Sequence, residues 1–225
     1  MKSLRLAIVT IPRYNIGIFI LLFFSAILFY GGGTLNNPDT EGYSFTRNFF
    51  SDLGILSEQN MISVICFATG LLVCGLTFGV YFYYFMKLFD KKTISHRMGI
   101  IGSLSGIAGA FFFIIVGFTP HNYVLDSHVI AVNWAFRCFL IASILLSFAM
   151  FKDKRFENKY AIGYLFFAIL IFLYILVLEF GPPPKQSDFS LVFNVVSQKI
   201  IVLVFILSVY YQSLGNSNFI SKHLK

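Results

Sequence analysis

Two histidines and an aspartate stand close together in the stretch TPHNYVLDSH, and their side chains are of the types that hold a metal ion. They are His121, Asp126 and His128. Zinc accepts imidazole nitrogens and carboxylate oxygens, and a catalytic zinc keeps a water in its fourth position. These residues therefore allow a metal-dependent lipid hydrolase. The longer zinc motif H-E-x-x-H is missing from the sequence, so we expect no resident cofactor, with zinc as the alternative.

A second set of polar residues lies within or beside apolar runs and could bind a polar ligand. Asn133 stands four residues before Arg137, on the same face of a helix. A charge at the centre of a bilayer costs about 2.5–3.5 kcal/mol on insertion scales, so Arg137 and Lys199 should face protein and find acidic partners. The candidates for this ligand site are Asp52, His128, Asn133, Arg137, Glu179 and Lys199.

The composition indicates that a membrane surrounds these residues. The chain has 225 residues, of which 57% are hydrophobic and 12% charged, and its mean hydropathy is +0.79. Six apolar segments are each near the ~20 residues that a helical span needs. They lie at about 15–33, 61–86, 98–118, 128–150, 160–180 and 192–213. We expect an all-α fold, a polytopic bundle of six transmembrane helices in a single domain over 1–225, with the first segment kept as an anchor.

The basic residues predict how the bundle is oriented. If the loops alternate sides, 13 of the 17 Lys and Arg residues fall on the side of the two termini. The positive-inside rule places that side in the cytoplasm, and we expect the plasma membrane. They are Lys2, Arg5, Arg13, Lys87, Lys91, Lys92, Arg97, Lys152, Lys154, Arg155, Lys159, Lys222 and Lys225. Because these charges are divided among short loops, the net charge of +7 does not predict nucleic-acid binding.

Small residues four apart in the third segment predict a close helix–helix contact. Gly102, Gly106 and Ala110 form such a ridge. Packing within the chain is the first interpretation of the ridge, and a homodimer through this face is the alternative.

Several short motifs resemble those of an uncharacterised prokaryotic family of six-helix membrane proteins, a domain of unknown function related to the DRAM- and Sfk-like group. RNFFSDLG, GFTPHNYVLDSHVIAVNWAF and SQKI are similar to stretches of that family, although the family usually has F-P where this chain has F-T-P. The positions that match are Ser51, Asp52, Gly54, Pro120, His128, Ala131 and Phe136, with Lys199 in the place of an arginine. The resemblance implies a non-enzymatic role in membrane organisation.

The residues and the resemblance together favour a polar pocket on the outer side that binds or senses a lipid headgroup or another small polar ligand. Membrane lipids are then the expected partners. In this hypothesis Arg137 and Lys199 attract phosphate or carboxylate, and Asp52, His128 and Glu179 orient it. The metal-dependent lipid hydrolase is the first alternative, and a small transporter or an accessory subunit is the second.

Overall fold

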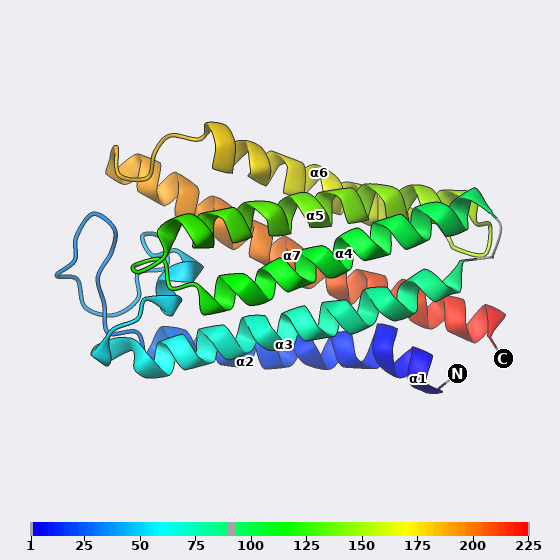
Figure 1. The fold of residues 1–225 in the computed structure, drawn as a ribbon, viewed down its shortest axis with the longest axis horizontal. Helices are drawn as coiled ribbons and strands as arrows, with labels where there is room; N and C mark the ends of the chain where they lie inside the picture. Colours follow the sequence, from blue (N-terminus) through cyan, green and yellow to red (C-terminus); the bar gives the residue numbers. More distant parts are fainter. Residues whose placement is uncertain (1, 90–92, 225) are drawn as a thin grey trace.

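The computed structural model describes residues 2–89 and 93–224, and within these ranges six long helices make up the fold (Figure 1). Their lengths and composition are those of helices that cross a membrane. The helical elements are α1 (Lys2–Arg5), η1 (Leu6–Thr10), α2 (Ile11–Leu28), η2 (Phe50–Gly54), η3 (Glu58–Asn60), α3 (Met61–Phe85), η4 (Met86–Leu88), α4 (Ile94–Phe118), α5 (Leu125–Lys152), α6 (Asn158–Phe180) and α7 (Asp188–His223). The predicted all-α membrane bundle is confirmed.

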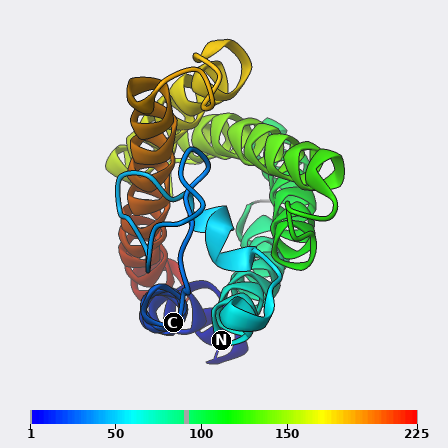
Figure 2. The same ribbon diagram turned by 90° about the vertical axis from the view of Figure 1, so that its left-hand side faces the viewer.

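The long helices form a ring in the order of the sequence (Figure 2). Each helix packs against the next, and contacts between α2 and α7 close the ring. Large aromatic side chains fill much of the interior, as where Phe205 of α7 meets Phe113 of α4 and Phe139 of α5 with ring centroids 5.5 and 5.2 Å apart. The helices enclose a central axis (Figure 2), and the side chains that point towards this axis form the interior of the bundle.

The two ends of the ring differ in charge. The start of α1 and the end of α7 lie at the same end (Figure 1), together with η4 and the turn between α5 and α6. Most of the basic residues that the sequence assigns to the side of the termini belong to these segments; Lys91, Lys92 and Lys225 lie outside the described residues. The long connection between α2 and α3, with η2 and η3, lies at the opposite end (Figure 1), called the capped end below.

The first membrane helix begins earlier and ends earlier than the predicted 15–33. Helical residues run from Lys2 to Leu28, with a π-helical turn at Leu6–Thr10. Pro12 has no N–H group, so it cannot donate to the carbonyl oxygen of Ile8 four residues before it. The amide of Asn216 on α7 donates to that oxygen instead, at 3.1 Å. A tertiary contact therefore compensates for the proline, and the helix continues towards the N-terminus.

The last helix is longer than the predicted 192–213, because its C-terminal turns pack against the rest of the bundle. Phe219 and Ile220 are buried, and the ring of Phe219 stacks on Phe156 with centroids 4.3 Å apart. The carboxylate of Glu157 accepts hydrogen bonds from Asn218 and from Lys222, the latter at 2.7 Å. Hydropathy alone ends the span early, since the polar residues of this extension are recognised only by their partners.

Acid is expected to loosen this extension through Glu157. Hydrogen bonds from Lys159, Lys222 and Asn218 lower the pKa of Glu157 from 4.5 to about 2. A depressed pKa contributes stability above the unfolded value, and that stability is lost as the pH falls towards the folded value. Between pH 4.5 and about 2, hydrogen exchange of residues 214–223 should accelerate more in the wild type than in Glu157→Gln. Glu41→Gln, a change in the α2–α3 connection, is the control and should behave as the wild type does.

The small-residue ridge of α4 packs inside the bundle, as its first interpretation has it. A Cβ atom at Gly106 would stand 2.6 Å from the ring of Phe82, and one at Gly102 would stand 3.1 Å from Leu146. Ala110 is 1% exposed. Side chains of α3 and α5 therefore cover the ridge formed by Gly102, Gly106 and Ala110.

Candidate functional site

A short 3-10 helix, η2, lies in the mouth of the helix ring at its capped end (Figure 2). Leu53 is fully buried there, and the backbone N–H of Phe50 donates to Oε1 of Gln198 on α7 at 2.6 Å. The preceding loop is tied to the start of α7 by an exposed ion pair between Arg47 and Asp188, 2.8 Å apart. Segments remote in the sequence thus hold η2 in place.

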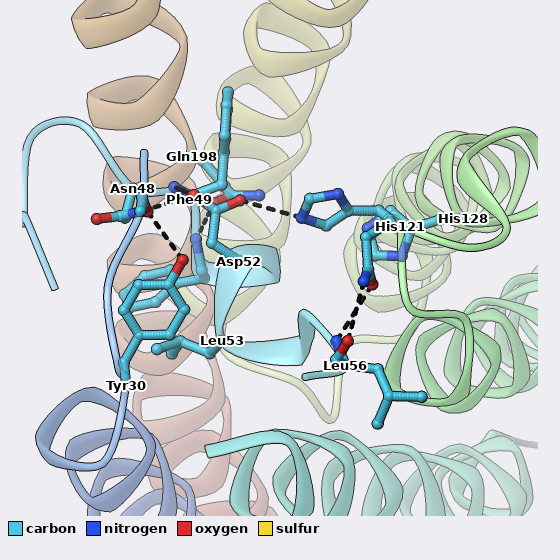
Figure 3. A network of polar contacts seen from close by, with 12 residues as sticks. Tyr30, Asn48, Phe49, Asp52, Leu53, Leu56, His121, His128 and Gln198 are labelled. Atoms are coloured by element: carbon cyan, nitrogen blue, oxygen red, sulfur yellow. Dashed lines mark hydrogen bonds and ion pairs between the residues drawn. The ribbon is translucent and has the colours of Figure 1, made fainter. Parts of the chain in front are cut away.

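Asp52 of η2 is the centre of a buried hydrogen-bond network (Figure 3). One carboxylate oxygen accepts from the Asn48 amide at 2.9 Å and from the Phe49 backbone N–H at 3.0 Å. The other lies 3.1 Å from Nε2 of His121, which therefore carries the proton, because an ionised carboxylate only accepts. Burial and the nearby Asp52 carboxylate also raise the pKa of Tyr43 above its ordinary value. The capped end thus holds a buried carboxylate, that of Asp52, which is the acceptor for each of these three contacts.

Lys199 is buried near this network, as the sequence predicts. Its ammonium group donates to the backbone oxygen of Asn48 at 2.5 Å. The rings of Phe50, Tyr43 and Phe45 surround it, with centroids 4.5, 5.3 and 5.3 Å away. Asn48 thus contacts both Asp52 and Lys199. The aromatic rings and the carbonyl oxygen take the place of the water that would solvate the ammonium group at the surface.

His128, in the first turns of α5, is buried with its ring close to His121, the centroids being 5.7 Å apart. Its Nδ1 lies 2.7 Å from the backbone oxygen of Thr119. A carbonyl can only accept, so Nδ1 carries the proton and, in the neutral ring, the lone pair is on Nε2.

Arg137 and Glu179 form an ion pair of their own between α5 and α6, as the sequence predicts. Both side chains are 37% exposed, and the described contacts do not join the pair to the Asp52 network. Asn133 is half-buried and does not line the cavity described below. Five of the six candidate ligand residues therefore divide into Asp52, His128 and Lys199 at the capped end and the separate pair of Arg137 and Glu179, and Asn133 is in neither group.

The predicted metal ligands do not meet as a group. Asp126 is exposed in the first turn of α5, while His121 and His128 are directed to Asp52 and Thr119. Within residues 2–89 and 93–224, no three His, Cys, Asp or Glu side chains are arranged to hold a metal ion.

An open cavity of ≈ 110 Å³ lies along the axis of the ring, beneath η2. Phe50 and Ser51 of η2, Gln198 of α7 and His128 of α5 line it towards the capped end, and Asn15 of α2 lines it further along. The remaining lining residues are Ile16, Phe19, Phe23, Phe67, Leu71, Cys74, Phe78, Phe113, Val116, Val132, Phe136, Val202, Phe205, Ile206 and Val209.

Comparison with protein-family models assigns the chain to a family. Residues 23–210 match the family described as "Protein of unknown function (DUF998)". The chain belongs to this family. Comparison with curated proteins and with solved structures returns no match.

In this DUF998 protein, the sequence analysis missed two residues that contribute to the site and the role of a third. They are Asn48, Gln198 and the role of His121 as the partner of Asp52. Asn48 stands four residues before Asp52 in the RNFFSDLG motif, which is the signal that could have identified it. Gln198 is next to Lys199 in SQKI and was available by the same reasoning.

Proposed function

We propose that this DUF998 protein binds a lipid-like amphiphile, with the apolar chain of the ligand in the axial cavity and its polar group at the capped end. The cavity carries this proposal. Its walls are almost entirely apolar, and polar side chains from three separate elements, Ser51, His128 and Gln198, converge near η2. Ligand sites are typically apolar hollows with a few placed polar groups.

The shape of the cavity suits an extended chain. Its lining residues on α7 recur at helical spacing from Gln198 to Val209, eleven positions apart. At about 1.5 Å rise per residue, this corresponds to roughly 16 Å along the axis. An apolar cavity of about 150 Å³ elsewhere binds benzene, so the ≈ 110 Å³ of this cavity holds part of one hydrocarbon chain, and the rest of the chain would lie outside it.

The protein is proposed to act by binding alone, in the plasma membrane, with the ends of α1 and α7 in the cytoplasm. The basic residues at the end of the bundle where both termini lie support this orientation through the positive-inside rule. η2 would then close the cavity on the outer side. The resemblance to the DRAM- and Sfk-like group supports a role in the organisation of membrane lipids.

The proposal is tested by photolabelling in lipid nanodiscs. A dodecane that carries a diazirine in mid-chain should label the residues that line the cavity, and Val202→Phe should lose most of that labelling because the new ring occupies the cavity. Leu203→Phe is the matched control, since Leu203 is adjacent on α7 but 55% exposed to the surroundings of the bundle. Its labelling should equal that of the wild type, as peptide mass spectrometry would show.

Labelling of the wild type only at outward-facing positions such as Leu203 would disprove the proposal. Metal analysis of the same sample separates the hydrolase alternative. One zinc ion per chain that is lost in His121→Ala would replace the binding proposal with a metal-dependent hydrolase.

A further inference from the structure

We infer that the polar group of this ligand is an uncharged hydroxyl that donates a hydrogen bond to Nε2 of His128. The inference rests on the proposed function and adds to it the chemical class of the ligand, a long-chain alcohol. It follows from which atoms at the capped end of the cavity are already occupied and which are free.

His128 supplies the free acceptor. The side chain is 5% exposed and lines the cavity. Its Nδ1–H is committed to the oxygen of Thr119, so the neutral ring offers a lone pair at Nε2. No residue in the described ranges donates a hydrogen bond to that nitrogen. An acceptor in the wall of an apolar cavity gains from a donor, and a hydroxyl group of a ligand would supply one.

Gln198 and His121, the other large polar side chains at the capped end, are already paired. Gln198 accepts from the Phe50 backbone through Oε1 and also hydrogen-bonds to Tyr174. His121 is held by the Asp52 carboxylate. The hydroxyl of Ser51, which also lines the cavity, can either donate or accept, so the acceptor at Nε2 of His128 decides which head group fits.

An anionic head group does not fit this end of the cavity. The described residues that line the cavity include no lysine or arginine. Lys199 is occupied by the oxygen of Asn48, and Arg137 by Glu179. The buried carboxylate of Asp52, next to His121, would repel a second negative charge. A carboxylate or phosphate would thus enter an apolar space without a counter-charge.

The test is competition against the photoreactive dodecane in nanodiscs that hold the full chain. Dodecan-1-ol, dodecane, dodecanoate and dodecylamine are added at equal mole fractions of the membrane. Dodecan-1-ol is expected to displace the label at about one tenth of the mole fraction that dodecane needs, which corresponds to one hydrogen bond. Dodecanoate should be the weakest competitor.

Variants at the two histidines locate the effect. His128→Leu should remove the difference between dodecan-1-ol and dodecane, and His128→Gln, which offers an amide oxygen at similar reach, should keep part of it. His223→Leu is the matched control, because His223 is exposed at the end of α7 and does not line the cavity, and it should keep the full difference.

The outcomes separate this inference from the proposed function. Equal competition by dodecan-1-ol and dodecane, or stronger competition by dodecanoate or dodecylamine, overturns the hydroxyl inference while cavity labelling still supports the binding of a chain. Absence of cavity labelling overturns both. If His128→Leu fails to fold, the order of the four competitors on the wild type decides.

Discussion

Replacing Asp52 by alanine is expected to lower the free energy of unfolding by about 3–5 kcal/mol. The buried carboxylate accepts from the Asn48 amide, the Phe49 backbone and the His121 ring, and all three bonds would be lost, although the Asn48 amide keeps its bond to the oxygen of Gly33. The buried ammonium group of Lys199 would also lose its nearby negative charge. An unfolding titration in mixed micelles measures the change.

Asp188→Ala provides the matched control for this prediction. Asp188 also accepts from a cation, Arg47, at the same end of the molecule, but its side chain is 62% exposed. Exposed ion pairs are worth at most about 1 kcal/mol, so this change should cost little. Equal losses from the two substitutions would show that Asp52 is not a buried centre of the network.

Lys199→Met separates the contribution of charge from that of hydrogen bonding. Met has a similar length and would lie among the rings that now surround the ammonium group. Without Lys199, the loss caused by Asp52→Ala should be smaller by about 1–3 kcal/mol, because a positive charge is no longer left alone. Simple additivity of the two changes would mean that the two charges do not interact.

The existence and the approximate places of the six long helices could be predicted from the sequence, because apolar runs of spanning length have few other uses. Their ends could not. Pro12 would ordinarily limit the first helix, and only the amide of Asn216, some two hundred residues later, explains why helical residues precede it. Which face of each helix points into the bundle could not be predicted either, since both the lipid and the protein interior accept apolar side chains.

The part of the candidate site that consists of charged residues could be predicted from the sequence. A charge inside a membrane bundle must find a partner, and the sequence analysis therefore placed Lys199 below the surface and expected an acidic partner for Arg137, which is Glu179. It did not place Asn48 or Gln198, because a neutral amide carries no charge that demands a partner, and only their positions beside Asp52 and Lys199 in the motifs indicated them. The cavity itself depends on how the side chains of five helices and η2 leave space, which no spacing in one sequence records.

Asn216→Leu is expected to cost about 2–3 kcal/mol, because it leaves a buried carbonyl without a donor. Asn216 is 1% exposed, and its amide donates to the oxygen of Ile8 and to the hydroxyl of Tyr81, each at 3.1 Å. The hydroxyl of Tyr81 would keep its bond to Tyr164, at 2.8 Å, so the larger loss falls on Ile8. Ser221→Ala, an exposed change on the same helix, should stay within about 0.5 kcal/mol of the wild type.

The same substitution in a Pro12→Ala background decides whether the proline creates the need for Asn216. Alanine restores an N–H group at position 12, four residues after Ile8, and this group can donate to the carbonyl of Ile8 within the helix. Asn216→Leu should then cost about 1–2 kcal/mol less than it does beside Pro12. If the cost is the same in both backgrounds, the carbonyl of Ile8 does not depend on Asn216, and the extension of the first helix towards Lys2 must have another cause.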